Sequence, residues 1–339
     1  MSHYTAYFAA TCLSLLIATT PSLANDAPKK ELTVYTYDSF VSDWGMGPLI
    51  KPTFEEQCGC TLNLVGMEDA VAMLQRLKLE GASTKADIVL GLDLNLVDDA
   101  KKSGLFTTHT VDTRALEMPI DWQDDTFVPF DYGYFAFVYN TELMPNPPKS
   151  LDELVNAGPE LKIIIQDPRS STPGLGLLLW MKSVYGDKTD AAWSKLSDNI
   201  LTTTKGWSEA YFSLFLAGEA PMVLSYSTSP AYHMAIEGTE QYQAAAFEEG
   251  HYLQVEVAAK LKASKNSELA DDFLNFMVSE GFQKHLPLSN VMYPVNTPTD
   301  MPEAYGKLIK PAQVLQLDTA QINQNRKQWV NDWLNIMTQ

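Results

Sequence analysis

The stretch LTVYTY at residues 32–37 is followed by two similar runs, TLNLV at 61–65 and ADIVL at 86–90. β-Branched and aromatic residues of this kind favour strands. Residues 50–57 and 71–80, which separate the three runs, have the apolar spacing of helices. Strand, helix, strand, helix, strand in this order is typical of parallel strands joined by helical crossovers. We therefore predict an α/β unit with a mainly parallel sheet.

The same pattern starts again farther along the chain. Residues 131–139 (DYGYFAFVY) predict a long aromatic strand, and residues 163–165 and 222–226 predict two shorter ones. Residues 171–182 (STPGLGLLLWMK) predict a helix, because Ser and Thr directly before a proline are a strong helix start. A second α/β unit of mainly parallel strands flanked by helices is therefore expected.

Two segments are expected to connect these units, one at residues 127–132 and one at 251–255. The chain is thus predicted to form a two-lobed α/β fold. Lobe one would comprise residues 28–128 and 253–339, and lobe two would comprise residues 129–252. A hinge made of a few crossing segments is what ligand-driven closure of two lobes requires.

The N-terminal residues 1–24 predict a cleaved signal peptide. They contain no Asp, Glu, Lys or Arg, and their apolar stretch is too short to span a bilayer comfortably. Small residues stand at Ser22 and Ala24, the form of a cleavage site after about Ala24. We therefore expect a periplasmic protein.

The formal net charge of −18 argues against nucleic acid as a partner, because phosphates require a basic surface. It is compatible with a cationic ligand, although a solvated acidic surface is the simpler explanation. The sequence has no Gly-x-Ser-x-Gly, His-Glu-x-x-His or Walker motif, and its histidines are scattered. We therefore expect no catalytic residues, no metal site and no cofactor.

Two cysteines remain after the predicted cleavage, Cys58 and Cys60 on either side of Gly59. An oxidising compartment permits a bond between them. Without a nearby pair of histidines they make a poor zinc site. They are expected to be a local structural feature, bonded or free.

Aromatic and acidic residues recur in loops that follow predicted strands. Ligands of open α/β sheets bind outside the carboxyl ends of the strands, which is where these loops are expected to lie. Five loops have this position and contain aromatic residues, acidic residues or the polar start of a helix: 37–44, with Tyr37 and Trp44; 68–69, with Asp69; 170–173, with Ser171 and Thr172; 206–209, with Trp207; and 226–230, with Tyr226, Ser227, Thr228 and Ser229.

These loops together would suit a flat cation with a polar tail. Aromatic faces attract a delocalised cation by roughly 0.5–2 kcal/mol per contact. Asp69 can accept from an exocyclic amine, and the helix starts after Ser171 and Ser229 favour an anion such as phosphate. Three of the loops have simpler explanations: Ser171 and Thr172 can serve as a helix cap, Trp207 can be a core residue, and Tyr37 can pair across strands. Only their joint occurrence points to a ligand.

At these residues the chain closely resembles the periplasmic thiamine-binding proteins of bacterial thiamine ABC importers. The resemblance runs through nearly the whole mature chain and is carried by these segments: 32–44 (LTVYTYDSFVSDW), 86–93 (ADIVLGLD), 126–139 (TFVPFDYGYFAFVY), 166–180 (QDPRSSTPGLGLLLW), 204–211 (TKGWSEAY), 224–233 (LSYSTSPAYH) and 250–259 (GHYLQVEVAA). It implies a class II periplasmic-binding-protein fold. It also implies capture of thiamine, thiamine monophosphate or thiamine diphosphate, and delivery to a membrane permease that a separate ATPase powers.

The family's binding positions match this sequence one by one. Asp69 is the acid after the second strand, with Ala70 beside it where a relative has glycine. The other matching positions are Ser171, Thr172, Trp207, Tyr226, Ser227, Thr228 and Ser229, followed by Tyr37 and Trp44 in the N-terminal aromatic loop. The sequence departs from the pattern at Val291, where a close relative has tryptophan. One aromatic wall is missing there if that position lines the site.

Two other functions stay open at this point. One is a binding protein for ferric iron or a polyamine. Iron capture in related proteins usually relies on adjacent tyrosines, and the sequence contains no Tyr-Tyr pair. A polyamine site could use Asp38, Asp43, Asp69 and Asp93. The other is an exported enzyme acting on thiamine compounds, which would need a cysteine nucleophile in the cleft.

Overall fold

The computed structural model describes residues 1–3 and 29–338. The predicted cleavage site after Ala24 and nearly all of the predicted signal peptide lie outside the described residues. Within the described part, none of the helices combines the length and the apolar character that a membrane span needs.

The first sheet contains β1 (Glu31–Tyr37), which pairs in parallel with both β2 (Thr61–Met67) and β3 (Ile88–Asp93). The connecting helices are α2 (Met46–Cys58) and α3 (Ala70–Glu80). This confirms the predicted parallel strands with helical crossovers. Most apolar side chains of the predicted strands are buried, although Leu64 and Val65 of β2 are only partly buried, and this burial supplies the driving force for packing the helices on the sheet.

The second sheet contains β6 (Ile163–Gln166), which pairs in parallel with β7 (Ile200–Thr204) and β8 (Met222–Tyr226). The helix predicted at residues 171–182 is α6 (Thr172–Tyr185), three residues longer at its C-terminus. Ser171 is its N-cap residue and Pro173 occupies the first turn. Proline suits that place because its fixed φ matches a helix and its missing N–H is not needed there.

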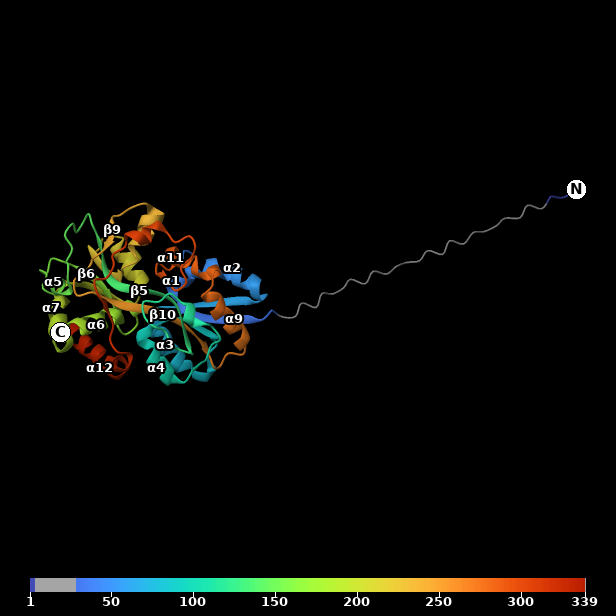
Figure 1. Ribbon diagram of the computed structural model, residues 1–339, viewed down its shortest axis with the longest axis horizontal. Coiled ribbons are helices and arrows are strands. Elements are labelled where there is room, and N and C mark those ends of the chain that lie inside the picture. The colour runs from blue at the N-terminus through green and yellow to red at the C-terminus, as the bar shows by residue number, and fades with distance from the viewer. Residues whose placement is uncertain (4–28, 339) are drawn as a thin grey trace.

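Two long antiparallel strands join the sheets, β5 (Phe127–Asn140) and β10 (His251–Leu261). The resulting strand order is β2-β1-β3-β10-β5-β8-β6-β7. Figure 1 shows β5 and β10 in the middle of the molecule, between the helices of the two halves. Both expected crossing segments lie on these strands. The exact lobe boundaries stay a prediction, since β5 runs without interruption from one sheet into the other.

The other elements cover the faces and edges of the sheets. In chain order they are α1 (Asp38–Val41), α4 (Val97–Ser103), β4 (Phe106–Thr107), α5 (Leu151–Val155), α7 (Thr189–Leu196), α8 (Pro230–Tyr232), β9 (Tyr242–Ala244), α9 (Ser267–Met277), α10 (Glu280–Gln283), α11 (Leu286–Ser289), β11 (Tyr293–Pro294), β12 (Val314–Leu315) and α12 (Thr319–Met337). Two π-helical segments, Glu209–Phe215 and His233–Glu237, lie beside β8 and α8.

The C-terminal helix α12 contacts both halves of the molecule. Its Arg326 pairs with Asp99 of α4, and its Trp333 ring meets Trp193 of α7 with centroids 6.3 Å apart. Residues 253–339 were predicted to belong to lobe one. The structure adds that the end of this segment also packs on helices of the second sheet.

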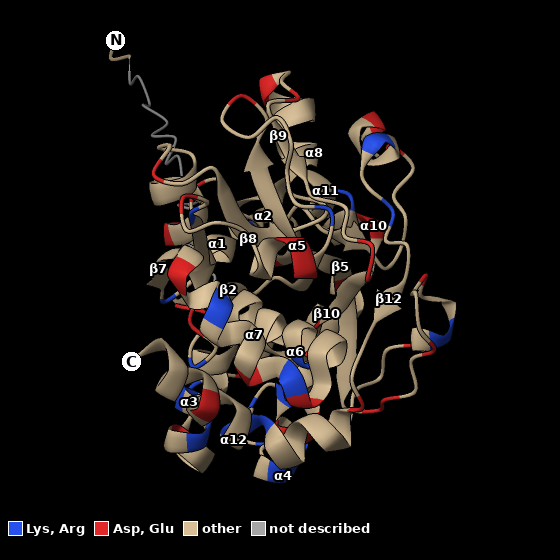
Figure 2. Ribbon diagram, turned by 90° about the vertical axis from the view of Figure 1, so that its left-hand side faces the viewer, with Lys and Arg blue, Asp and Glu red and all other residues tan. Residues whose placement is uncertain are grey.

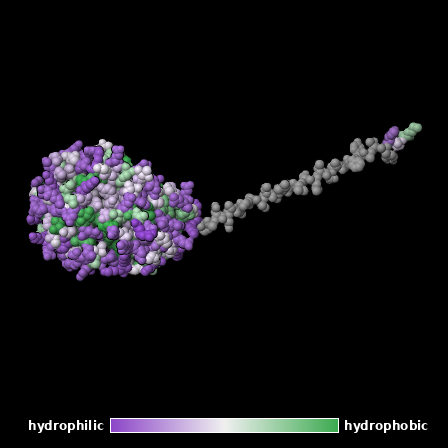
Figure 3. Space-filling model, in the orientation of Figure 1, coloured by the Kyte–Doolittle hydropathy of each residue, from purple (hydrophilic) through white to green (hydrophobic). Residues whose placement is uncertain are grey.

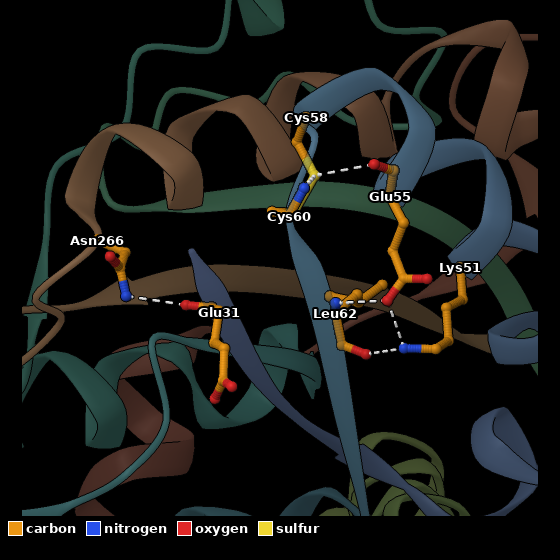
Figure 4. The surroundings of a disulfide bond; sticks show 7 residues. All are labelled: Glu31, Lys51, Glu55, Cys58, Cys60, Leu62 and Asn266. Atoms are coloured by element: carbon orange, nitrogen blue, oxygen red, sulfur yellow. Dashed lines mark hydrogen bonds and ion pairs between the residues drawn. A yellow bond between two sulfur atoms is a disulfide. The ribbon is translucent and has the colours of Figure 1, made fainter. Parts of the chain in front are cut away.

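Cys58 and Cys60 form a disulfide bond. It joins the end of α2 to the residue before β2, with Gly59 between them in a left-handed conformation. Figure 4 shows that the neighbouring contacts also tie α2 to β2: the Lys51 ammonium group contacts both Glu55 and the Leu62 carbonyl oxygen. The cysteines are thus part of a local connection between a helix and a strand.

Charged residues lie mostly on the surface. Figure 2 shows Asp and Glu on the elements of both halves, and the face seen in Figure 3 is predominantly hydrophilic with only small apolar areas. Five carboxyl groups among the described residues are exceptions because they are buried: Asp69, Asp87, Asp93, Asp131 and Glu256. Buried carboxyl groups are costly unless they are paired, protonated or hydrogen-bonded.

Gly91 leaves space for the ring of Tyr37. The pairing of β3 with β10 skips Gly91, which has a φ of +97°. A Cβ atom there would lie 2.3 Å from Cε1 of Tyr37. This bulge therefore requires glycine for two reasons, its positive φ and the close approach of the Tyr37 ring.

We expect Gly91→Ala to lower the free energy of unfolding by about 2–4 kcal/mol, because backbone strain adds to the clash with Tyr37. The matched control is Gly104→Ala, since Gly104 also has a positive φ but has nothing within 4 Å of its Cβ position. That control should lose only about 1 kcal/mol. Urea unfolding measures both variants, and equal losses would exclude a contribution from the Tyr37 contact.

Candidate functional site

A cavity that opens to solvent lies where the two sheets meet, and we call it the central cavity. Its wall includes Tyr37 at the end of β1, Asp69 after β2, and Tyr226 at the end of β8. These are the carboxyl ends of parallel strands, where the sequence predicted a site. Its lining residues are Tyr37, Asp38, Ser39, Glu68, Asp69, Trp207, Tyr226, Ser229, Glu256, Asn290, Val291 and Met292.

A second, larger cavity adjoins it, and we call it the aromatic cavity. The two cavities share Ser39, Trp207, Ser229, Asn290 and Val291. The aromatic cavity is also lined by Trp44, whose ring centroid lies 4.8 Å from that of Phe212. Trp44 follows α1 and Phe212 follows β7, so this contact spans the two halves. Trp44 itself is 46% exposed.

Asp69 contacts both residues of the predicted Ser-Thr pair. Its Oδ2 accepts from the Ser171 hydroxyl group at 2.8 Å, and its Oδ1 accepts from the Thr172 hydroxyl group at 2.9 Å. Oδ1 also accepts from the backbone N–H of Ala70 at 2.8 Å, which caps α3. These predicted site residues, far apart in sequence, are therefore brought together. Of the four, only Asp69 reaches the wall of the central cavity.

Burial raises the pKa of the Asp69 carboxyl group, and the hydrogen bonds from Ala70, Ser171 and Thr172 partly offset this rise. The sequence predicted separate roles for these residues, Asp69 toward an amine and the hydroxyl groups toward an anion. The structure shows that Asp69 and the two hydroxyl groups hydrogen-bond to one another. A ligand group that enters here has to compete with this contact.

Other contacts between the same two edges accompany it. The Ser208 hydroxyl group donates to Asp38 Oδ1 at 3.1 Å, and the backbone N–H of Ala72 donates to the Ser170 carbonyl oxygen at 3.3 Å. Each of these contacts joins a helix of the first sheet, α1 or α3, to a loop of the second. Polar contacts thus connect the two sheets on the side where Asp69 lies.

Trp207 is half-buried and lines both cavities. Its indole N–H donates to the Ser225 hydroxyl group at 2.8 Å, and its ring stacks on Tyr211 with centroids 5.0 Å apart. The hydrogen bond and the stacking fix the orientation of the ring. A planar ligand in the central cavity could therefore meet an aromatic surface that is already in place.

The residues of the 226–229 turn have different surroundings. Tyr226 and Ser229 line the central cavity, whereas Ser227 and Thr228 are fully buried and do not. The Ser227 backbone N–H donates to the Tyr134 carbonyl oxygen, and Thr228 Oγ1 contacts the sulfur of Met292 at 3.8 Å. The structure therefore brings Tyr226 and Ser229 to the cavity and leaves the other two behind it.

Tyr37 contacts two cavity residues that were not predicted from the sequence, Glu256 and Asn290. Its hydroxyl group lies 2.9 Å from Glu256 Oε2 and 2.9 Å from Asn290 Oδ1. Burial raises the pKa of the Tyr37 phenol well above its ordinary value. Glu256 did leave a signal, because it is an acidic residue inside the apolar strand β10 and is only 7% exposed. Asn290 left none, since it follows the four-residue helix α11 in an irregular segment.

Val291 lies on the wall of both cavities with a φ of +55°. Among the residues that the structure describes, it is the one non-glycine residue with positive φ. Such a conformation is strained for a β-branched side chain and costs about 1–3 kcal/mol. The position at which the sequence departs from its family is therefore a cavity wall.

The family model of the bacterial extracellular solute-binding proteins matches residues 83–325. The thiamine-binding periplasmic protein of Escherichia coli K12 is 55% identical over 323 residues, which cover 95% of this chain and 97% of that protein. The protein of the same name from Brucella abortus is 54% identical and covers 90% of this chain and 92% of its own. The iron uptake protein A1 of Synechocystis is more distant, at 25% identity, covering 80% of this chain and 78% of its own.

Solved structures agree with the sequence relatives. A periplasmic thiamin binding protein superposes with a TM-score of 0.89 at 55% identity, covering 92% of this chain and 97% of its own. A binding protein from Actinobacillus pleuropneumoniae with bound fructose-6-phosphate superposes with a TM-score of 0.78 at 18% identity, covering 91% and 99%, and shows the fold alone. The predicted two-lobed, class II fold is thereby confirmed. The chain belongs to the bacterial extracellular solute-binding proteins.

Proposed function

We propose that this protein captures thiamine, thiamine monophosphate or thiamine diphosphate in the periplasm. It then delivers the ligand to the membrane permease of an ABC importer with a separate ATPase. The observation that carries the proposal is the 55% identity to a thiamine-binding periplasmic protein over 95% of this chain. The proposal needs no cofactor and no catalytic residue.

The chemistry of the central cavity supports this ligand class. Thiamine consists of two flat rings, one of which carries a permanent positive charge. Tyr37, Tyr226 and Trp207 offer aromatic faces from three different strand ends. Aromatic faces and carboxylates both attract a delocalised cation, and Asp69 and Glu256 supply the carboxyl groups.

The contact of Asp69 with Ser171 and Thr172 suggests how binding closes the lobes. Asp69 belongs to the first sheet, whereas Ser171 and Thr172 begin α6 of the second. Bending of β5 and β10 would separate these partners and open the cavity. A ligand held by both sides favours the closed arrangement, which the permease then recognises.

Calorimetry with a ligand panel tests the proposal. We expect thiamine and its two phosphates to bind at micromolar concentrations or below, and spermidine and Fe(III) to bind far more weakly. The two competing ligands represent the polyamine and iron functions that the sequence left open. Heat from spermidine or Fe(III) with none from the thiamine compounds would overturn the proposal.

Replacement of Trp207 tests the cavity itself. We expect Trp207→Ala to weaken thiamine binding by about 1–3 kcal/mol, because stacking and burial are lost. Trp329→Ala is the matched control, since Trp329 is also half-buried but lies on α12 beside Lys182. Thiamine affinity that is unchanged in Trp207→Ala would mean that this ring serves only the packing around Tyr211.

The carrier function also predicts that thiamine is returned intact. Cys58 and Cys60 are bonded to each other and do not line the central cavity, so neither is placed to attack a bound ligand. Mass spectrometry after prolonged incubation should recover unmodified thiamine. Appearance of separate pyrimidine and thiazole products, absent from a sample without protein, would instead indicate an enzyme.

A further inference from the structure

The proposed function leaves unexplained a pair of buried carboxyl groups on the two crossing strands. Asp131 of β5 and Glu256 of β10 are directly opposite each other in the antiparallel ladder. Asp131 is completely buried, and Glu256 is 7% exposed through its place on the wall of the central cavity. Like charges at directly opposite positions of two strands destabilise a sheet.

No cationic side chain compensates this pair. Among residues 29–338, neither Asp131 nor Glu256 takes part in an ion pair. The charged and titratable groups that surround them are Tyr37 of β1, Asp69 before α3, Asp93 of β3, Tyr226 of β8 and Tyr305 near the C-terminal segment. All of these are neutral or acidic. Arg326 lowers the pKa of Asp93, but it is not among the groups that shift the pKa of Asp131 or Glu256.

Neutral donors instead hold the two carboxyl groups in place. The Asn290 side-chain NH₂ donates to Asp131 Oδ2 at 2.6 Å and lies 3.4 Å from Glu256 Oε2. The Gln254 side-chain NH₂ donates to Glu256 Oε1 at 3.1 Å. Asp131 Oδ1 is buried and lacks a hydrogen bond of good geometry among the described residues, and both the side chain and the backbone N–H of Glu256 lie beside the Asp131 carboxyl group. A proton between the two carboxyl groups would satisfy it.

The geometry at Tyr37 also accommodates that proton. The Tyr37 hydroxyl group has one hydrogen atom but two acceptors at 2.9 Å, Glu256 Oε2 and Asn290 Oδ1. When Tyr37 donates to Asn290, a proton on Glu256 can donate to the Tyr37 oxygen atom. The shared proton therefore has two alternative places, one between the two carboxyl groups and one on Glu256 toward Tyr37, and both keep it on the carboxyl pair.

Burial also favours a proton on the Asp131–Glu256 pair. It raises the pKa of both Asp131 and Glu256 above their ordinary values, and for Glu256 the neighbouring Asp131 charge is the second cause. Two carboxyl groups this close titrate as a unit and share one proton near neutral pH.

We propose that Glu256, supported by Asp131, is the counter-ion of the ligand's cationic ring, and that the pair releases its shared proton to solvent when the cation enters. This inference rests on the proposed function for the nature of the ligand. The cation supplies the positive charge that the surrounding side chains lack. A ligand that brings this charge favours the ionised pair, so binding and proton release are linked.

The linked release of a proton determines how thiamine affinity changes with pH. At low pH the ligand must displace a bound proton, whereas at high pH the pair is already ionised. Thiamine affinity should therefore rise with pH over the range in which the pair still holds its proton, by up to about tenfold per pH unit for one proton released. Thiamine without phosphate is the proper probe, because a phosphate monoester itself titrates near pH 6.

Calorimetry of the wild-type protein at about pH 7, in two buffers with different ionisation enthalpies, measures the protons released per thiamine bound. We expect a release of between a half and one proton. Thiamine binding without proton release and without pH dependence would overturn the counter-ion role and leave the proposed function intact. Absence of thiamine binding at every pH would overturn the proposed function itself.

Glu256→Gln separates this role from a merely structural one. It should abolish most of the proton release and weaken thiamine binding at about pH 8 by at least about tenfold, because one charge beside the cation is lost. Glu240→Gln is the matched control: Glu240 forms an exposed ion pair with Lys307, so its removal should leave affinity within about twofold. A Glu256→Gln protein that is folded by circular dichroism and still releases the proton would also overturn the inference.

Discussion

The antiparallel pairing of β5 with β10 is the interaction on which the rest of the structure depends. These strands carry the chain from one sheet to the other, and their side chains are almost entirely buried. Each sheet completes itself on one of them, β3 against β10 and β8 against β5. The two halves therefore share one continuous hydrogen-bonded ladder, and a change in their relative position must bend it.

The same pairing explains where the polar groups of the cavity lie. Parallel strands from both sheets end toward the crossing strands, so their loops meet over residues of β5 and β10. Asp69 reaches Ser171 and Thr172 from the opposite sheet, and Tyr37 reaches Glu256. Every one of these contacts joins segments that are distant in sequence. Polar groups that are buried together in this way must be satisfied by one another or by a ligand.

The backbone around the cavity is locally unusual at two places. Gly91 bulges out of β3 and leaves space for the Tyr37 ring, and Val291 keeps a positive φ where it lines both cavities. A regular strand directs its side chains alternately to the two faces. A side chain at position 91 would then occupy the space of the Tyr37 ring. The bulge and the strained turn give Tyr37 and the cavity wall their positions. Strain of this kind persists where the surrounding packing holds it in place.

The sequence by itself determined the class of fold and most of the elements. Alternating apolar strands and helices are local patterns, and burial follows from them, which is why β1, β2, β3 and α6 were placed to within a few residues. It also placed Asp69, Trp207 and Tyr226 at strand ends, and the close family resemblance pointed to the ligand class.

Only the tertiary structure decided which of these residues face the cavity. Ser227 and Thr228 have the same polar character as Ser229, yet they point away, because a tight turn divides its side chains between its two sides. Asn290 and the pairing of Glu256 with Asp131 were likewise hidden, since strand register and irregular backbone bring them together. Contacts between distant segments depend on how two sheets are joined, and no local pattern encodes that distance.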